Sequence, residues 1–262
     1  MRAEPLGEPL QNSTVIECRG ITYHLPDGRA LVSDLNLQIS EGETLVLLGE
    51  SGSGKTTTLK LINRLLEPTQ GEIIVEGRKT TEWDPIRLRR QMGYVIQEIG
   101  LMPHLSVERN VGLVPMLEGW PTERTRQRCE ELLRLVGLDP EVFAARRPHQ
   151  LSGGQRQRVG VARALAADPP ILLMDEPFGA LDPVTRAEIQ QEFRALEKRL
   201  NKTIIFVTHD LREGLLLGDR VGLMDAGRLL AVLRPHEFIQ SPIPEIQAFV
   251  AAYRGHDLEF DI

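Results

Sequence analysis

The sequence predicts an α/β fold in which helices cover a parallel β-sheet, with an antiparallel edge sheet and an inserted group of helices. The first observation is a short apolar run, Thr44–Leu48, that leads through a glycine-rich turn into a helix at Lys55–Leu66. The second is the return of apolar runs at Ile171–Met174 and Ile204–Thr208, after a helical stretch at residues 104–149. Strands that alternate with helices favour a parallel sheet with right-handed crossovers.

Hydrophobic periodicity predicts the remaining elements. Short alternating or apolar runs indicate strands at Val15–Tyr23, Leu35–Ile39, Ile73–Val75, Tyr94–Ile96, Val221–Met224 and Leu229–Leu233. Helical patterns indicate further helices at Glu123–Val136, Val184–Leu200 and Pro244–Tyr253. The first two of these strands are expected to form the antiparallel edge sheet, and the last two a hairpin.

These elements predict one domain at residues 14–255, with a helical insertion at about residues 98–158. Residues 1–13 are polar and contain proline, so we expect a disordered leader without a signal peptide. Residues 256–262 are expected to form a C-terminal tail.

The composition is ordinary for a globular protein, with 41% hydrophobic and 26% charged residues among 262. A formal net charge of -6 gives no electrostatic support for nucleic-acid binding, so no nucleic-acid partner is expected. Cys18 and Cys129 lie far apart, which favours a reducing compartment over a disulfide framework or a zinc site. No apolar run has the length of a membrane helix, so a role at a membrane requires another chain.

The glycine-rich turn after the first buried strand is a P-loop motif, Gly49-Glu50-Ser51-Gly52-Ser53-Gly54-Lys55-Thr56, followed by Thr57. Its glycines allow successive N–H groups to point at phosphate oxygens, and the following helix adds its positive end. Lys55 is expected to reach the β- and γ-phosphates, and the Thr56 hydroxyl to bind Mg²⁺. By itself the motif does not distinguish a kinase, a GTPase or an ATPase.

The strand at 171–174 ends in Asp175 and Glu176. Such a pair could be a plain strand end, but with a P-loop upstream we expect Asp175 to bind Mg²⁺. Glu176 would then orient and polarise the water that attacks the γ-phosphate.

A second stretch with phosphate-binding character is Leu151-Ser152-Gly153-Gly154-Gln155, which opens a helix that runs to about Ala166. Ser152 and the two glycines leave backbone N–H groups free at the positive end of this helix. A capped helix start would explain Ser-Gly-Gly alone, whereas the full motif with Arg156-Gln157-Arg158 after it is harder to explain in that way.

With these motifs in this order, the chain resembles the ATP-binding cassette (ABC) family over about residues 14–255. The matching positions are the P-loop at 49–56, Gln97, the signature at 151–155, Asp175-Glu176, Ala180-Leu181-Asp182 and His209. The resemblance implies a P-loop NTPase fold with a RecA-like core, an antiparallel β edge subdomain and an inserted α-helical subdomain. It also implies ATP hydrolysis, with ATP and Mg²⁺ bound.

The resemblance further implies roles for three polar residues. Gln97 would contact Mg²⁺ or the attacking water, and Asp182 would lie in a loop across a dimer interface. His209 would contact the γ-phosphate and hold Glu176 and the water in place. A glutamine or histidine after a strand is usually a surface or structural residue, and only the order of the motifs favours the catalytic roles.

In the family, two chains pair head to tail, and each ATP lies between the P-loop of one and the signature of the other. The resemblance therefore implies a homodimer with C2 symmetry, in which Ser152, Gly153, Gly154, Gln155 and Asp182 face the partner's nucleotide. It also implies transmembrane permease subunits, a peripheral place at the cytoplasmic face of a prokaryotic inner membrane, and indirect work with a secreted or periplasmic substrate-binding protein.

An apolar stretch after Gln97 is a candidate surface for a permease: Ile99, Leu101, Met102, Leu105 and Val107. It could form a small core for the insertion, a groove for a permease helix, or both.

One position departs from the family pattern, which usually has an aromatic ring just before the first turn to stack on adenine. Here that residue is Leu25, and Tyr23 lies two residues earlier on the same strand face if the strand is regular. Either Tyr23 stacks from a shifted register or Leu25 makes a weaker apolar contact, and Tyr23 is slightly favoured.

Several strings are similar to the ATPase subunits of bacterial osmoprotectant importers, which carry glycine betaine, choline, carnitine and related quaternary amines. They lie at residues 57–64, 97–104, 160–169 and 175–183. Many such subunits carry a C-terminal pair of regulatory domains, which a chain that stops at Ile262 is not expected to contain. The alternatives are the ATPase of an exporter or lipid transporter, or a soluble non-transport ABC ATPase.

Overall fold

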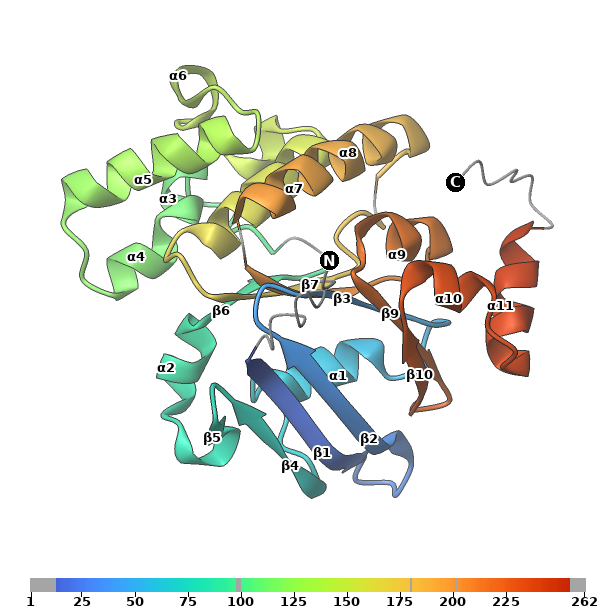
Figure 1. Ribbon diagram of the computed structural model, residues 1–262. Coiled ribbons are helices and arrows are strands. Elements are labelled where there is room, and N and C mark those ends of the chain that lie inside the picture. Colours follow the sequence, from blue (N-terminus) through green and yellow to red (C-terminus); the bar gives the residue numbers. More distant parts are fainter. Residues whose placement is uncertain (1–12, 98–99, 180, 201, 255–262) are drawn as a thin grey trace, which may run out of the picture.

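Two β-sheets lie on opposite sides of helix α1 (Lys55–Ile62) in the computed structural model of the chain (Figure 1). The structure describes residues 13–97, 100–179, 181–200 and 202–254. The predicted leader at 1–13, apart from Ser13, and the predicted tail at 256–262 therefore lie outside the described residues. The α/β fold class predicted from the sequence is confirmed.

The larger sheet has six strands in the order β10-β9-β3-β8-β7-β6. All neighbouring pairs from β9 to β6 are parallel, and β10 adds an antiparallel edge. The bounds are β3 Thr44–Leu48, β6 Met92–Val95, β7 Ile171–Asp175, β8 Thr203–Val207, β9 Arg220–Asp225 and β10 Arg228–Leu233. Because β3, β7 and β8 are adjacent and parallel, their carboxyl ends lie at one edge of the sheet.

The smaller sheet is antiparallel, in the order β2-β1-β4-β5. Its strands are β1 Thr14–His24, β2 Ala30–Ser40, β4 Gln70–Val75 and β5 Arg78–Lys79. The two predicted edge strands pair here as expected, although both are longer than the periodicity indicated.

A group of helices separates β6 from β7 and lies above the larger sheet (Figure 1). It contains α3 Val107–Val111, α4 Leu113–Leu117, α5 Thr122–Leu135, α6 Pro140–Phe143, η2 Pro148–Gln150 and α7 Gly153–Leu165. The other helices are η1 Thr80–Glu82, α2 Pro85–Arg90, α8 Pro183–Leu200, α9 Leu211–Leu217, α10 Pro235–Ile239 and α11 Pro244–Arg254.

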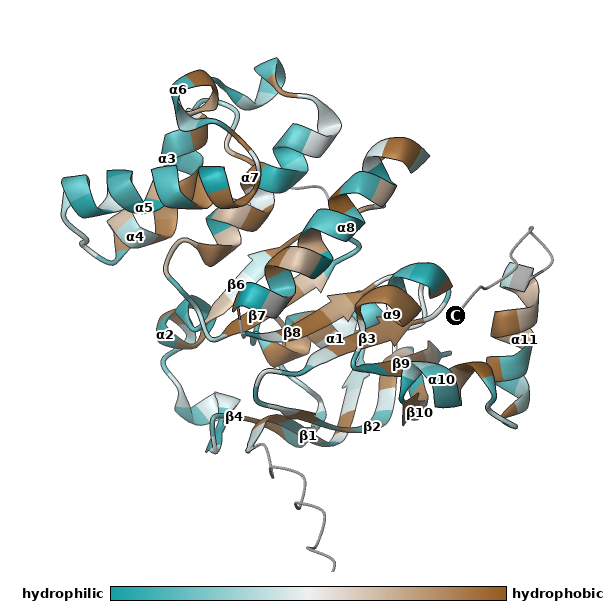
Figure 2. Ribbon diagram, turned by 45° about the horizontal axis from the view of Figure 1, so that its top comes forward, coloured by the Kyte–Doolittle hydropathy of each residue, from teal (hydrophilic) through white to brown (hydrophobic). Residues whose placement is uncertain are grey.

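Strands β3, β7 and β8 of the larger sheet are buried on both faces, which explains why they read as continuous apolar runs. Leu45 and Leu47 of β3 face α1 and the smaller sheet, whereas Val46 and Leu48 face the helices on the other side. Figure 2 shows this hydrophobic centre, with hydrophilic residues on the outer surface of α5. The polar residues that follow β3, β7 and β8 are therefore attached to fully buried strands.

The predicted end of the first helix is wrong, because α1 stops at Ile62 rather than Leu66. The Asn63 side chain accepts a hydrogen bond from the Leu65 backbone N–H at 3.0 Å, and Arg64 adopts a left-handed conformation with φ of 54°. Apolar spacing continues past this point, but the local hydrogen bond ends the helix.

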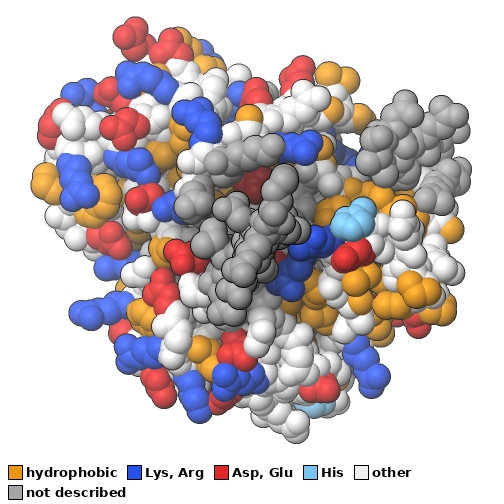
Figure 3. Space-filling view, in the orientation of Figure 1, with side chains coloured by type: hydrophobic (Ala, Val, Ile, Leu, Met, Phe, Trp, Pro, Cys, Tyr) orange, Lys and Arg blue, Asp and Glu red, His pale blue; other side chains and the backbone are white. Residues whose placement is uncertain are grey.

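Charged side chains of both signs are interspersed on the face drawn in Figure 3. Within the described parts of the chain, no helix has the length and hydrophobicity needed to cross a bilayer.

Candidate functional site

The P-loop connects the end of β3 to the start of α1. It requires glycine at two positions where carbonyl oxygens of other segments lie too close for a side chain. A Cβ atom at Gly49 would lie 2.2 Å from the Met224 carbonyl oxygen, and one at Gly54 would lie 2.6 Å from the Leu31 carbonyl oxygen. Gly54 also has a φ of 103°, which other residues rarely adopt. The Ser53 hydroxyl is buried here, and no described residue offers it a hydrogen-bond partner. These features fit a phosphate cradle with a polar group left to bind.

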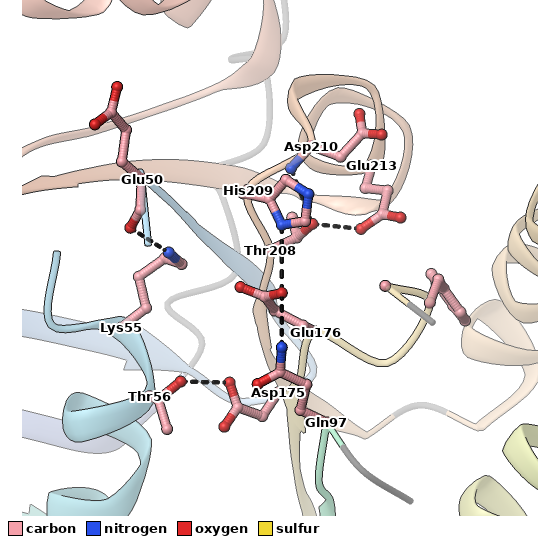
Figure 4. Close-up of polar contacts among 12 residues, drawn as sticks. Glu50, Lys55, Thr56, Gln97, Asp175, Glu176, Thr208, His209, Asp210 and Glu213 are labelled. Atoms are coloured by element: carbon pink, nitrogen blue, oxygen red, sulfur yellow. Dashed lines mark hydrogen bonds and ion pairs between the residues drawn. The ribbon is translucent and has the colours of Figure 1, made fainter. Parts of the chain in front are cut away.

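Lys55 is the buried cation of the loop. Its Nζ donates hydrogen bonds to the backbone carbonyls of Gly49 and Glu50, both at 2.8 Å, and Figure 4 shows the bond to Glu50. Burial lowers the pKa of Lys55, and the nearby carboxylates of Glu176 and Asp175 act in the opposite direction. The ammonium group is thus held over the loop by neutral carbonyls, where phosphate oxygens would be stronger partners.

Thr56 and Asp175 meet beside the P-loop. The Thr56 hydroxyl donates to Asp175 Oδ1 at 2.8 Å (Figure 4). The Tyr94 hydroxyl lies 3.4 Å from Asp175 Oδ2. Asp175 is 3% exposed, and burial raises its pKa. A hydroxyl and a carboxylate are hard oxygen ligands, and Mg²⁺ commonly takes few protein ligands beside phosphates and water. Among the described residues, no group of three or more His, Cys, Asp or Glu side chains could hold a metal alone.

Glu176, Gln97 and His209 come together from the ends of three strands, β7, β6 and β8. Glu176 Oε2 accepts a hydrogen bond from Gln97 Nε2 at 3.2 Å and lies 3.3 Å from His209 Nδ1 (Figure 4). Glu176 has a left-handed backbone with φ of 43°, and its N–H donates to the Val207 carbonyl at 2.8 Å. A strained, non-glycine residue of this kind often marks a functional position.

A cavity of about 960 Å³ joins these groups. It is lined by P-loop residues with Thr56 and Thr57, by Gln97, Glu176 and His209, and by residues of α11. Its carboxylate and imidazole differ in exposure, since the Glu176 side chain is 17% exposed and that of His209 is 53% exposed. The cavity therefore has a fixed carboxylate inside and a histidine at its mouth.

Helix α11 contributes residues that the sequence did not reveal. Phe249 and Tyr253 line the cavity with ring centroids 5.4 Å apart, and the Tyr253 hydroxyl donates to the His209 carbonyl oxygen. The available signal was an aromatic pair four residues apart on a predicted helix, but nothing in the sequence indicated what that face contacts. Tyr94, next to Asp175, was missed in the same way.

The signature residues do not reach this cavity. None of Ser152, Gly153, Gly154, Gln155 and Asp182 lines it. Ser152 instead caps α7: its hydroxyl accepts from the Gln155 N–H at 3.2 Å, and the Gln155 side chain accepts from the Ser152 N–H at 3.0 Å. Within one chain, this is the capped helix start that the sequence left open as an alternative.

The two signature glycines have different surroundings. A Cβ at Gly154 would lie 2.7 Å from Thr185 Cγ2 on α8, whereas a Cβ at Gly153 would lie 3.7 Å from Leu181 Cδ2, an ordinary contact. Asp182 directly precedes α8, and its side chain accepts a hydrogen bond from the Thr185 N–H at 3.1 Å, which lowers the pKa of Asp182. Gly154 is therefore required for packing inside the chain, while Gly153 has room.

Ala180, from the same motif as Asp182, lies outside the described residues.

Neither candidate for the adenine contact lines the cavity. Tyr23 pairs with Val32 across the edge sheet and packs against the core cluster that contains α1, and Leu25 lies in the following turn. The choice between Tyr23 and Leu25 stays a prediction.

The apolar stretch after Gln97 divides between core and surface. Val107 is buried, whereas Met102 is 41% exposed, and Ile99 lies outside the described residues. The buried Asn110 side chain holds the loop by accepting from the Met102 N–H at 2.7 Å and donating to the Ser106 carbonyl at 3.0 Å. The stretch thus contributes to the insertion's core and also presents an apolar side chain to the outside.

Comparisons with known proteins agree with this geometry. The ABC transporter family model matches residues 32–179. The chain is 50% identical over 228 residues to the glycine betaine/carnitine/choline transport ATP-binding protein OpuCA of Bacillus subtilis, a match that covers 87% of this chain and 60% of that protein. It is 53% identical over 211 residues to the glycine betaine uptake system ATP-binding protein YehX of Escherichia coli, covering 80% of this chain and 68% of that protein.

Among solved structures, the dimeric ATP-binding cassette MJ0796 in a post-hydrolysis state, bound to ADP and Pi, has a TM-score of 0.75 and 35% sequence identity. That match covers 84% of this chain and 98% of the cassette. The chain spans about 60% of the length of several curated relatives that it matches.

Proposed function

The chain belongs to the ABC transporter family, and from this membership we propose that it is the ATP-hydrolysing subunit of a bacterial importer for osmoprotectant quaternary amines. The observation that carries the proposal is the contact of Glu176 with Gln97 and His209 above the P-loop. A P-loop alone would bind a nucleotide, whereas a carboxylate held at this place can direct a water molecule at the γ-phosphate.

In the proposed reaction, the P-loop N–H groups and Lys55 bind the phosphates of ATP. Thr56 and Asp175 would hold Mg²⁺, which when bound neutralises charge on the β- and γ-phosphates. Glu176 Oε1 accepts a hydrogen bond from the attacking water, because Oε2 is engaged by Gln97 and His209. His209 holds the Glu176 carboxylate in line and contacts the γ-phosphate from the mouth of the cavity.

Two copies of the chain are needed to complete each site. The start of α7 carries free backbone N–H groups at its positive end but is absent from the P-loop cavity of its own chain. We place Ser152, Gly153, Gly154, Gln155 and Asp182 against the nucleotide of a second copy. The dimeric assembly of the related cassette supports this arrangement.

The permease is proposed to contact an apolar surface near the helical insertion. Ile86 on α2 and Met116 and Leu117 on α4 are 57–64% exposed. The guanidinium of Arg90 donates to the Leu117 carbonyl at 3.1 Å, so α2 and α4 are neighbours. With Met102, these side chains offer a surface to a cytoplasmic helix of a membrane partner, which would place the chain peripherally at the cytoplasmic face.

Glu176→Gln tests the hydrolytic role. The amide keeps the size of the side chain and removes the charge that polarises water, so we expect ATP binding to persist while turnover falls by at least about 100-fold. ATP binding is measured by calorimetry, turnover by phosphate release, and dimer formation by gel filtration with ATP. Glu131→Gln on the exposed face of α5 is the matched control. Normal turnover in Glu176→Gln would contradict the proposal.

The cargo requires a separate test. The chain is reconstituted with its permease and binding protein in proteoliposomes, and uptake of labelled glycine betaine, choline and carnitine is measured against maltose. ATP-dependent uptake of at least one quaternary amine, lost in Glu176→Gln, is the expected result. Active ATP hydrolysis without uptake of any of them would reject the cargo and leave the ATPase assignment standing.

A further inference from the structure

The turn after β8 carries His209, and its backbone is fixed by a network that the reaction described above does not use. His209 is exposed and reaches Glu176 through one ring nitrogen. The residues on either side of it, Thr208 and Asp210, are joined by a hydrogen bond from the Asp210 N–H to the Thr208 hydroxyl at 3.0 Å. The position of the imidazole therefore depends on what holds the Thr208 side chain.

Glu213 holds Thr208 from the first turn of α9. The Thr208 hydroxyl donates to Glu213 Oε2 at 2.5 Å, and the Gln190 side-chain amide of α8 donates to Glu213 Oε1 at 2.8 Å. Glu213 is 3% exposed, and Thr208 is also buried. Figure 4 shows the Glu213 carboxylate directed at Thr208, behind His209 and away from the Lys55 side of the site.

A carboxylate in this position is costly for the fold. Burial raises the pKa of Glu213, and neighbouring Asp210 acts in the same direction. A well-packed apolar residue would serve the core at least as well as a buried charge that needs several hydrogen bonds. Buried titratable groups next to a reaction centre are candidates for a functional role.

The same network reaches the loop on the other side of the reaction centre. Arg186 lies one turn before Gln190 on α8, and its guanidinium donates to the carbonyls of Phe178 and Leu181 at 3.2 and 3.1 Å. These carbonyls belong to the loop that follows Glu176. Helix α8 therefore holds both the loop behind Glu176 and, through Glu213, the turn that carries His209.

We propose that Glu213 is a positioning residue for ATP hydrolysis, which fixes His209 relative to Glu176 through Thr208 and ties both to α8. The inference rests on the proposed ATPase function. Glu213 does not line the P-loop cavity, and in this proposal it acts only on the geometry of the His209–Glu176 pair.

Removal of the carboxylate should lower kcat and leave nucleotide binding intact. For Glu213→Ala and Thr208→Val we expect kcat to fall by about 10- to 100-fold, the loss that misplacement of a catalytic group by roughly 1 Å produces. KM and the Kd for ATP should stay within about threefold of wild type, because the P-loop is untouched. Glu213→Gln and Thr208→Ser should retain most of the activity. The glutamine can restore both hydrogen bonds of Glu213 once the Gln190 amide rotates, and the serine keeps the hydroxyl of Thr208.

A second threonine–glutamate pair, between buried Thr44 and half-buried Glu197, supplies the control for lost stability. The Thr44 hydroxyl, at the start of β3, donates to Glu197 Oε1 of α8 at 2.7 Å. This is the same kind of bond, from a threonine hydroxyl to a glutamate carboxylate, but it lies at the opposite end of β3 from the P-loop. Thr44→Val should lower Tm as Thr208→Val does and leave kcat unchanged.

The position of His209 is read without hydrolysis from the NMR signals of its ring in chains with labelled histidine. We expect the His209 signals to move in Glu213→Ala and Thr208→Val and to stay in place in Thr44→Val and Glu213→Gln. His209 signals that stay in place in Glu213→Ala and Thr208→Val would overturn the inference. A normal kcat in fully folded Glu213→Ala would also overturn it. A wild-type chain that binds ATP without hydrolysing it would instead reject the proposed function. Movement of the His209 signals in Glu213→Ala and Thr208→Val would then still show that Glu213 and Thr208 fix the place of His209.

Discussion

The P-loop and the start of α7 both look like phosphate-binding stretches, yet they are built differently. The P-loop is joined to side chains from the ends of β6, β7 and β8 by contacts among Thr56, Asp175, Glu176, Gln97 and His209. At the start of α7, the side chains of Ser152 and Gln155 instead accept hydrogen bonds from each other's backbone N–H groups. The side chains around the P-loop come from its own chain, whereas the start of α7 has its backbone N–H groups and the Ser152 hydroxyl to offer to a partner.

The P-loop side and the signature side also differ in their effect on the stability of the folded chain. The P-loop side contains a buried lysine, a buried aspartate and a left-handed glutamate, all at positions assigned to ATP. The signature side contains an ordinary helix cap, which stabilises the chain by about 1 kcal/mol. The difference indicates that the charged groups of the proposed ATP site are organised within a single chain.

The largest expected effect is on the P-loop side. Lys55→Ala removes a charged phosphate contact, so ATP affinity should fall by roughly 1.5–3 kcal/mol, or about 10- to 150-fold. Calorimetry measures the change, with Lys79→Ala on the edge sheet as the control for loss of one lysine. Wild-type ATP affinity in Lys55→Ala would mean that Lys55 does not contact the phosphates and that the P-loop is not the ATP site.

An intermediate effect separates the two signature glycines. Gly154→Ala forces a Cβ against Thr185 and should destabilise the chain by about 1–3 kcal/mol, whereas Gly153→Ala should fold normally. Thermal unfolding of both variants without nucleotide tests this difference. If both unfold like wild type, α7 and α8 are less tightly packed than described; loss of hydrolysis in a stable Gly153→Ala would mark Gly153 as the glycine that faces the partner.

The smallest expected effect is on thermal stability, and it comes from the buried Asp175 carboxylate on the P-loop side. Burial raises the pKa of Asp175, so the folded chain favours the neutral carboxyl, and stability falls as pH rises from the unfolded pKa through the folded one. Asparagine does not ionise, so Asp175→Asn should raise Tm at neutral pH by about 2–4 °C, the shift that 1 kcal/mol produces in a domain of this size.

The gain in Asp175→Asn should shrink as the pH falls, because burial raises the pKa of Asp175 and the wild-type carboxyl then becomes protonated. Unfolding scans between pH 4 and pH 8 measure it. A variant that is less stable than wild type at pH 8 would show that Asp175 is stabilised as a charge in the free chain.

Much of the P-loop half could be predicted from the sequence because its residues follow buried strands whose ends share one sheet edge. Periodicity located β3, β7 and β8 to within a residue, and the polar residues after them were therefore expected to meet. The role of Glu213 could not be predicted, because its partners Thr208 and Gln190 are set by how α8 packs against α9.

Tyr23 shows a different limit of sequence reasoning. Alternation correctly placed it in a strand, but its pairing with Val32 turns that face towards the core cluster. The end of α1 was misplaced because apolar spacing does not register the Asn63 hydrogen bond that ends the helix. Both depend on local geometry that a one-dimensional pattern does not contain.

The central claim is that each site combines the P-loop half of one chain with the signature half of another, and a mixing experiment tests it most directly. Lys55→Ala and Ser152→Ala chains should each be inactive alone. Mixed in equal amounts, half of the dimers carry one intact site, so phosphate release should recover to about one quarter of the wild-type rate per chain. Turnover no higher than that of the two variants alone, in mixtures shown to form dimers, would contradict the claim.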